Sequence, residues 1–486
     1  MTDSLNLEKL RPCGRLETFS TARHNLSFYR NVGFTATYTS SDTPQSPLGN
    51  NIFAALRHVI AKYPNLSAIT LNEEQSFPNV YFARLTEIDL RTCVEICERR
   101  TPFPKDGEAD EELDEALAQQ HSRDFKEGLG SKPFWRLLVQ TSPNQATQFS
   151  ASWMWHHALA DGGSALLFHE SFLAGLNASG PDSDAGPIVP TPIATLLQPL
   201  EELHPMSMSW PFFLQAILGA MLPSIFAKRP AKLWAGNPVP EDTTTLPTPR
   251  YRTLIFSKET TLKLAQASRA ERASMTATLQ CLLAASLFAN LPATEYDKIS
   301  IFGPISMKRF LDVKETQMTN AIATYDYMHR RPSSRPTNSI SSSPSPSHIL
   351  QNFSWDEARA VKFKIQAEIA KEGRDNPNAL LKYVSDMPGF FLEKLGKPRS
   401  PSAEVSSLGV WRDKQGGGKW EVGRMVFSQF PDLTAGAFAM NVVTGGDGNA
   451  VINFCWGEWA VGEGMMRKVI EGVGDGVEGL IDGYEA

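Results

Sequence analysis

Two adjacent histidines, His156 and His157, are followed by Asp161 and then by Gly162. Imidazole is the side chain best suited to take a proton from a hydroxyl or an amine near neutral pH. An aspartate a few residues away can fix the chain around such a base, because a carboxylate accepts several hydrogen bonds. The residue types and their spacing therefore point to general-base chemistry. The alternative is an ordinary polar surface, where a histidine pair happens to precede an Asp-Gly turn.

The flanking residues predict a strand, a turn and a helix, which would hold the histidines at the end of the strand. Residues 147–155 alternate in the manner of a strand with one buried face. The apolar residues of that face are Phe149, Ala151, Trp153 and Trp155. Gly162 and Gly163 permit a tight turn, and Ser164 is predicted to cap the following helix. A positioned general base fits this context.

The run His156-His157-Ala158-Leu159-Ala160-Asp161-Gly162 resembles the HHxxxDG motif of the CoA-dependent acyltransferase superfamily. That superfamily includes chloramphenicol acetyltransferase, plant acyl-CoA:alcohol acyltransferases, condensation domains of nonribosomal peptide synthesis and fungal alcohol acetyltransferases. The resemblance implies that His157 is the general base and that His156 orients the turn. It also implies that Asp161 is mainly structural and that Gly162 belongs to the motif.

The resemblance covers nearly the whole chain and is closest to the fungal alcohol acetyltransferases. An opening with Gly14, Leu16-Glu17 and Arg23-His24 in this order is similar to theirs. Taken as residues alone, four polar side chains of this opening predict a structural ion-pair network, with the rim of a channel as the alternative. They are Arg15, Glu17, Arg23 and His24.

A stretch in the second half, Glu404-Val405-Ser406-Ser407-Leu408-Gly409, resembles the superfamily's Ser-Asn/Ser-Leu-Gly segment. The resemblance implies that hydroxyl and N–H donors there face the histidine. Attack on a thioester builds negative charge on the carbonyl oxygen, and one well-placed donor is worth about 3 kcal/mol. Ser406 and Ser407 are the candidates, with Ser407 standing where relatives often have Asn. The alternative is that both serines merely begin a strand.

Two further stretches bear on the donor and on the closing strands. Residues 304–309, Pro-Ile-Ser-Met-Lys-Arg, resemble a Pro-x-Ser-x-Arg stretch of fungal relatives, and Lys308 and Arg309 would suit the phosphates of CoA. The alternative is a pair of solvated cations. Residues 453–457, Asn-Phe-Cys-Trp-Gly, resemble the DFGWG motif of plant members only in part. Because Asn453 replaces the acid, a buried aromatic strand is the favoured interpretation.

Composition limits the functional classes. The chain has 486 residues and a net charge of −6, which favours two domains and excludes a basic surface for nucleic acid. Its five cysteines are odd in number and form no CxxC pair, so reduced, mostly buried thiols are expected, and no cluster has the spacing of a metal site. The first residues lack an apolar signal core. A cytoplasmic, monomeric protein is therefore expected.

The expected fold class is α/β, with strands interleaved with helices in each half. We expect a first acyltransferase half over residues 1–180, a crossover over 181–250 and a second half over 251–486. The superfamily resemblance implies two chloramphenicol-acetyltransferase-like α/β sandwich subdomains that face each other across a central tunnel. Residues 332–347, rich in Ser and Pro, are predicted to form a disordered loop.

The uncharged segment 210–227 has 18 residues, at the lower edge of membrane-spanning length. Pro211, Gln215 and Pro223 argue against a span, which leaves burial or contact with a membrane or lipid surface. Elsewhere, the acidic run 106–125 predicts a solvated helix with few core contacts.

Helix starts are predicted at two places in the second half. Ser257 would cap one helix, and Ser354 with Glu357 would form a capping box for residues 355–371.

These observations predict an O-acetyltransferase that moves the acetyl group of acetyl-CoA to a small-molecule alcohol. The acceptor would attack the thioester directly in a ternary complex, since no nucleophile stands in a context that indicates an acyl-enzyme. Three alternatives stay open. They are transfer to an amine, a condensation enzyme that uses a carrier-protein thioester, and an inactive relative that acts as a binding protein.

Overall fold

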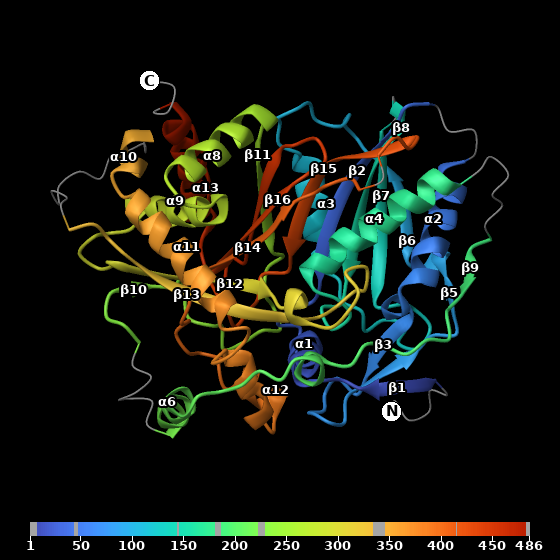
Figure 1. Cartoon of the computed structure of the whole chain (residues 1–486), viewed down its shortest axis with the longest axis horizontal. Coiled ribbons are helices and arrows are strands. Elements are labelled where there is room, and N and C mark those ends of the chain that lie inside the picture. Colours follow the sequence, from blue (N-terminus) through green and yellow to red (C-terminus); the bar gives the residue numbers. More distant parts are fainter. Residues whose placement is uncertain are drawn as a thin grey trace.

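The structure, a computed structural model, describes residues 7–42, 47–142, 145–179, 186–221, 229–333, 346–414 and 416–482. Strands and helices are interleaved along the chain and form two large sheets with helices packed against them (Figure 1). The predicted α/β class is confirmed.

The first sheet has five strands and carries the histidine pair at the end of its central strand. In spatial order, its strands are β15 (Trp420–Gln429), β2 (Val32–Ser40), β8 (Gln145–Trp155), β7 (Trp135–Ser142) and β6 (Val94–Glu98). β7 and β8 are antiparallel, as their short connection predicts. Trp153 and Trp155 lie two residues apart on one face of β8, are fully buried, and stack with ring centroids 4.2 Å apart.

Helices cover this sheet. α4 (Gly162–Ala178) packs against β2 and β15, and α2 (Leu48–Lys62) packs against α4. α3 (Glu111–His121) packs against β2 and against β11 (Arg250–Phe256) of the other sheet. The prediction of a solvated helix here was wrong. Leu113, Leu117 and His121 recur every four residues on one helical face and are buried, although acidic residues dominate the composition.

The second sheet has seven strands. In spatial order they are β10 (Leu233–Trp234), β12 (Lys298–Ser306), β14 (Ala403–Val410), β16 (Phe438–Thr444), β17 (Ala450–Trp456) and β11, with β13 (Ile322–Arg330) paired to β12. β12 and β14 pair at Ile301 with Ala403 and at Phe302 with Glu404. Beyond these pairs β12 continues along β13 and β14 along β16, so that the sheet forks.

Helices gather beside this sheet, on the left in Figure 1. They are α8 (Lys258–Ala270), α9 (Met275–Asn290), α10 (Pro346–Leu350), α11 (Trp355–Ala370) and α13 (Glu463–Asp482). The apolar helix α9 is buried as predicted, and Ser257 caps α8 by accepting a hydrogen bond from the Thr260 N–H at 3.2 Å. The capping box predicted for α11 does not form, because Glu357 is bonded instead to His329 Nδ1 at 3.0 Å.

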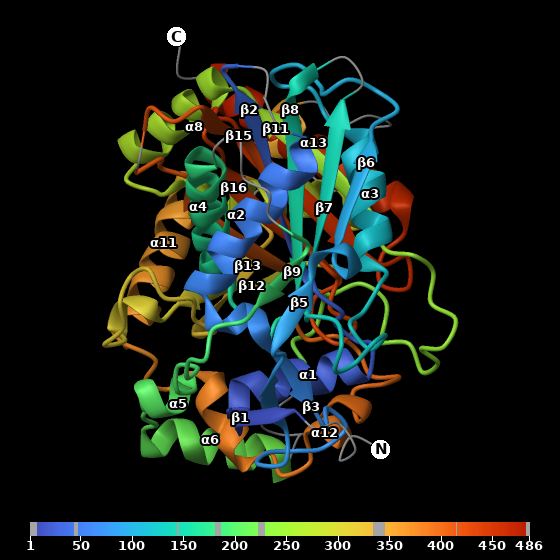
Figure 2. The ribbon, with the colours of Figure 1, turned by 90° about the vertical axis from the view of Figure 1, so that its right-hand side faces the viewer.

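The remaining elements lie at the bottom of Figure 2 or along one flank. A small sheet contains β1 (Glu8–Pro12), β4 (Tyr81–Arg84) and β3 (Ala68–Leu71), and β5 (Glu87–Asp89) pairs with β9 (Ile188–Pro190). The helices of this region are α1 (Arg15–Asn25), α5 (Leu200–Leu203), α6 (Trp210–Met221) and α12 (Met387–Leu392). α1 packs against α12, so the first and second halves of the chain meet here too.

The halves are also joined by one strand. β15 follows β14 along the chain, yet it pairs with β2 and completes the first sheet. The first sheet therefore cannot be completed by the first half of the sequence alone.

Two predicted segments fall partly outside the described residues. Of segment 210–227, helix α6 is described and residues 222–228 are not. Of segment 332–347, residues 334–345 are not described, and residues 346 and 347 begin α10. Among the helices that the structure describes, none has the length and apolar character needed to cross a membrane.

Candidate active site

The histidine pair occupies a tight turn between β8 and α4. The Leu159 N–H donates to the His156 carbonyl at 3.0 Å, and Trp155 Nε1 donates to the Ala160 carbonyl at 2.9 Å. The cap of α4 is Asp161 rather than the predicted Ser164. Asp161 Oδ1 accepts from the Ser164 N–H at 3.0 Å and from its hydroxyl at 2.9 Å. Aspartate and serine cap helices about equally well, so the sequence did not distinguish Asp161 from Ser164. The predicted cap therefore lies three residues after the observed one.

Asp161 also fastens the turn to the second half of the chain. Its Oδ2 accepts from the Thr319 hydroxyl at 2.9 Å and from the Ala321 N–H at 3.1 Å. Asn320 Nδ2 donates to the His157 carbonyl at 2.9 Å. Burial raises the pKa of Asp161, although these donors oppose the shift. The carboxylate is fully engaged with protein donors, which supports a structural role.

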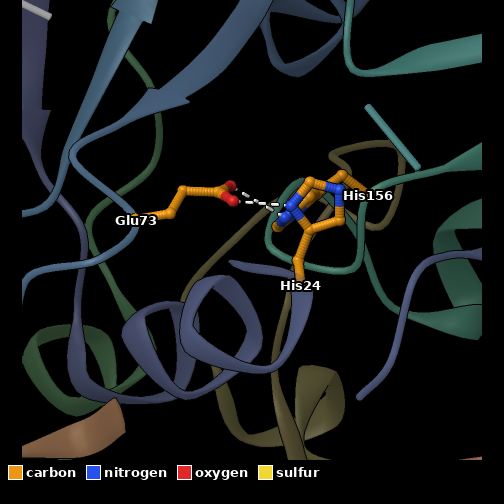
Figure 3. Close-up of side chains that lie close together, drawn as sticks. All are labelled: His24, Glu73 and His156. Carbon is orange, nitrogen blue, oxygen red and sulfur yellow. Dashed lines mark hydrogen bonds and ion pairs between the residues drawn. The ribbon is translucent and has the colours of Figure 1, made fainter. Parts of the chain in front are cut away.

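His156 lies beside a largely buried carboxylate, that of Glu73 (Figure 3). Glu73 Oε1 lies 3.1 Å from His156 Nε2, and Glu73 Oε2 lies 2.5 Å from His24 Nδ1. The Thr70 hydroxyl donates a hydrogen bond to Glu73 Oε1. Although burial alone would raise the pKa of Glu73, the two imidazoles lower it, so the carboxylate is ionised. Burial also lowers the pKa of His156.

Two histidines and a glutamate at these distances have the composition of a metal site. The positions of the ring protons, however, do not suit metal binding. The Phe125 N–H donates to His24 Nε2 at 3.1 Å, and the Ala158 N–H donates to His156 Nδ1 at 3.0 Å. A ring nitrogen that accepts a hydrogen bond carries no proton, so each ring keeps its proton on the nitrogen that faces Glu73. The cluster His24–Glu73–His156 is therefore a protonated unit held by hydrogen bonds and by the ion-pair contact of His156 with Glu73, rather than an open ligand set.

His157 lies on the other side of the turn, in the wall of a cavity of about 480 Å³. Its ring packs against Tyr29, with centroids 5.7 Å apart, and its Nδ1 has no hydrogen-bond partner in another residue. Burial, followed by the charge of Arg23, lowers the pKa of His157 to about 3, so the ring is neutral near pH 7. A neutral imidazole beside a cavity is the form that a general base requires.

The cavity lies where the second sheet forks, because its lining includes both diverging strand ends. Residues 304–306 of β12 and residues 404–409 of β14 line it, together with Gly162 and Gly163 of the histidine turn. Gly162 is held tightly, since a Cβ at this position would lie 2.8 Å from Leu408 Cδ2. The glycine therefore lets the turn approach β14 closely.

The structure brings most of the predicted site residues together. His157, Asp161, Gly162, Ser406 and Ser407 all line this cavity. Ser406 is buried, and Ser407 is partly exposed.

The two cations predicted to bind CoA have different surroundings. Arg309 lines the cavity and is exposed, at its mouth. Lys308 donates from Nζ to the Glu315 and Gln317 carbonyls, each at 2.6 Å, and so holds a loop together.

The four residues predicted to form an ion-pair network near the N-terminus do not pair with one another. Arg23 pairs with Asp432 at 2.6 Å and Glu17 with Arg11 at 2.7 Å. His24 contacts Glu73, and Arg15 lies over the Phe77 ring.

Several residues of the site were not identified from the sequence. Glu73, Thr319, Tyr29, Glu404 and Gln429 reach it from distant parts of the chain. Only Glu404 stands within one of the sequence motifs, the stretch 404–409 that contains the two predicted serine donors. No local spacing links the other four to the histidines, because the contacts form between separate elements.

Three comparisons agree with this geometry. The profile of the family described as "Alcohol acetyltransferase" matches residues 12–456. The "Probable alcohol acetyltransferase crmB" of Aspergillus fumigatus is 33% identical over 476 residues, which cover 95% of this chain and 97% of that protein.

Among solved structures, the TRI3 trichothecene 15-O-acetyltransferase from Fusarium sporotrichioides has a TM-score of 0.67 at 11% identity and covers 97% of this chain and 95% of that one. The first condensation domain of the calcium-dependent antibiotic synthetase has a TM-score of 0.57 at 12% identity and covers 98% and 96%. At these identities the two structures bear on the fold alone, and they support two chloramphenicol-acetyltransferase-like lobes.

Proposed function

Since this chain belongs to the alcohol acetyltransferase family and is an acyltransferase, we propose that it moves an acetyl group from acetyl-CoA to the hydroxyl of a small-molecule alcohol. The observation that carries the proposal is the position of His157. Its imidazole is neutral, lines a cavity, and lies across from the Ser406 and Ser407 segment. The product is an ester, and the second product is free CoA.

The proposed reaction is a direct transfer in a ternary complex. His157 takes the proton of the acceptor hydroxyl as the oxygen attacks the thioester carbonyl, and the imidazolium then gives a proton to the departing thiolate. Donors of the Ser406–Ser407 segment would stabilise the negative charge on the carbonyl oxygen. Asp161 and the cluster His24–Glu73–His156 hold the turn from its two sides and take no part in the bond changes.

The donor is proposed to enter at the mouth of the cavity, where Arg309 is exposed beside Ser306. Arginine suits phosphate oxygens, and an exposed cation makes binding depend on salt. Replacing Arg309 by Ala should raise the KM for acetyl-CoA about two- to fivefold at low salt and leave the KM for the alcohol unchanged. The exposed Arg467 of α13 provides the matched control, and Arg467→Ala should change neither constant.

The decisive experiment is an assay of the purified protein with acetyl-CoA and a panel of alcohols and amines, followed by free-thiol release and by mass spectrometry of the product. Ester formation supports the proposal. Amide formation would favour the amine alternative. Calorimetry that shows no CoA binding at any salt concentration would remove the acyl-CoA donor and favour a carrier-protein donor or an inactive relative.

We also propose that helix α6 contacts a membrane or lipid surface. Trp210 is 76% exposed and Met221 is 73% exposed, and Leu214 is exposed on the same uncharged helix. Exposed aromatic and aliphatic side chains of this kind favour the interface of a bilayer. Flotation with phospholipid vesicles tests this, with Trp210→Ser and Leu214→Ser together expected to abolish co-flotation.

A further inference from the structure

Glu404 places a carboxyl group in the wall of the active cavity, where the charge of Arg23 acts on it but no cation of the described residues contacts it. In β14, Ala403 and Val405 point into the apolar core beside the helices. Because side chains alternate along a strand, Glu404 and Ser406 point to the opposite face, and both line the cavity with His157. Among the ion pairs of the described residues, none involves Glu404. An ionised carboxylate in such a position is costly unless it takes up a proton or a ligand donates hydrogen bonds to it.

Within the described part of the chain, Glu404 receives one hydrogen bond. Gln429 Nε2 donates to Glu404 Oε1 at 3.2 Å and to Asn441 Oδ1 at 2.9 Å. These two acceptors fix the orientation of the amide, so Gln429 Oε1 accepts from the Tyr29 hydroxyl at 2.8 Å. A carboxylate has about four lone-pair positions, so Glu404 keeps acceptor capacity that the protein does not use.

Two tyrosine hydroxyls in the lining of the cavity donate their protons to protein acceptors. Tyr29 donates to Gln429, and Tyr325 donates to Gln280 Oε1 at 2.8 Å. Each hydroxyl proton is therefore directed into the protein, and what remains for a ligand is lone pairs. This wall, formed by Tyr29, Tyr325 and Glu404, recognises hydrogen-bond donors and offers an apolar or purely accepting ligand no partner.

We propose that Glu404 is a specificity-determining residue that accepts a hydrogen bond from a second hydroxyl or amino group of the acceptor. The acceptor is accordingly a diol, a polyol or an amino alcohol rather than a simple aliphatic alcohol. This inference rests on the proposed function and names its substrate class. A site built to bond a polar group rejects the analogue that lacks it, because the buried acceptor is then left unpaired.

The acceptor alcohol, rather than acetyl-CoA, is the substrate that can donate a hydrogen bond to Glu404. An acetyl thioester has no hydrogen-bond donor at its reacting end, and the phosphates of CoA would be repelled by a carboxylate. Arg309, the cation that suits those phosphates, lies at the exposed mouth of the cavity, whereas Glu404 lies in its largely covered interior. Burial raises the pKa of Glu404 to about 7, so assays at pH 8.5 examine the ionised carboxylate.

The first test needs no variant. The unmodified protein is assayed with 1-pentanol, 1,3-pentanediol and 1,5-pentanediol at saturating acetyl-CoA, and kcat/KM is compared. At least one diol should exceed 1-pentanol by about ten- to a hundredfold, as expected for a hydrogen bond to a charged group. Equal values for all three alcohols, with clear turnover, would overturn the inference and leave the proposed function standing.

The second test removes the carboxylate. Glu404→Met should lower kcat/KM for the preferred diol about ten- to a hundredfold and change the value for 1-pentanol less than threefold. Glu404→Gln, which preserves shape and one acceptor oxygen, should give an intermediate loss and guards against a folding defect. The exposed Glu421 of β15 is the matched control, and Glu421→Met should leave both values unchanged.

The remaining outcomes decide between roles. An equal loss for the diol and for 1-pentanol in both Glu404 variants would show a structural role and overturn the inference. A rise confined to the KM for acetyl-CoA would assign Glu404 to the pantetheine arm, which also overturns it. No turnover with any alcohol, together with no CoA binding by the unmodified protein, would remove the proposed function and this inference with it.

Discussion

The two histidines are neighbours in sequence, yet the regions around them differ in how their hydrogen bonds are used. On the side of His156, each ring nitrogen of the cluster with His24 and Glu73 lies near a protein polar atom, although the 3.1 Å contact of His156 Nε2 with Glu73 Oε1 is an ion-pair contact without hydrogen-bond geometry. On the side of His157, Nδ1 has no partner in another residue and the ring lines a cavity. Burial lowers the pKa of both rings, so the pKa direction does not distinguish them.

The two rings differ in what lies beside them, which is a carboxylate and a backbone N–H group at His156 and a cavity at His157. A ring enclosed by protein groups has nothing left for a substrate. A neutral ring in the wall of a cavity can reach a substrate there, which is typical of a functional site.

His157, in the wall of the cavity, should carry the catalytic step. His157→Ala should lower kcat about 10²–10⁴-fold with folding retained, because a general base is lost while no hydrogen bond to another residue is broken by loss of its Nδ1. His156→Ala should cost less activity and more stability. Thiol-release kinetics and thermal melting measure both, and His58→Ala, at an exposed position of α2, is the control. A larger loss of kcat for His156→Ala at equal stability would reverse the assignment.

Asp161 joins the two sides to the second half, so its replacement should affect stability and activity together. Asp161→Asn turns one accepting oxygen into an N–H group that faces donors, which costs roughly 1–3 kcal/mol in unfolding free energy. Activity should fall with it, since the turn that holds His157 loosens. Asp326→Asn, on the exposed side of β13, should change neither quantity. Lost activity with unchanged melting would instead indicate a direct chemical role for Asp161.

Replacing Glu73 in the cluster His24–Glu73–His156 should destabilise the protein with little effect on catalysis. In Glu73→Gln the amide N–H₂ would face a ring N–H of His24 or His156, which leaves a donor unpaired and costs roughly 1–3 kcal/mol. We expect kcat to fall less than tenfold. The next residue supplies the control, because Glu74 is exposed and Glu74→Gln should be neutral. A loss of kcat as large as that of His157→Ala, at unchanged stability, would contradict the structural role of this cluster.

Acid should weaken the fold through the buried histidines. The pKa of His157 and that of His169 are each lowered by burial to about 3, whereas an unfolded histidine titrates near 6.5. The unfolded chain therefore takes up protons first, and stability is lost as the pH falls from about 6.5 toward 3, by up to about 1.4 kcal/mol per pH unit for each group. Urea unfolding between pH 7 and 4 measures this, and His157→Gln should flatten the slope. An unchanged slope would mean that His157 is protonated in the folded state.

Much of the fold follows from local patterns in the sequence. The alternation in β8, the apolar run of α9 and the Ser257 cap each depend on neighbouring residues, and each was predicted. The motif likewise identified His157 and Asp161. Two predictions were wrong, namely that Ser164 caps α4 and that Ser354 and Glu357 form a capping box. In both cases a side chain has several potential partners, and only the folded state decides which of them it bonds.

The rest depends on contacts between distant segments. Glu73 and His156 lie far apart in the sequence and meet only in the folded chain. Glu404 of β14 meets Gln429 of β15 although the two strands belong to different sheets. The burial of α3 depends on β11, which lies more than a hundred residues later. The division of the chain at residues 180 and 250, and the role of the Ser406–Ser407 segment, stay predictions.

The late arrival of β15 has a consequence for how this protein is made. During synthesis, β2, β7 and β8 leave the ribosome long before residues 420–429 do, and until then one edge of β2 has no neighbour. An unpaired strand edge is prone to pair with other chains, and contacts of long sequence separation form slowly. The nascent first half therefore passes through an aggregation-prone interval, during which chaperones that shield strand edges would raise the yield of folded protein.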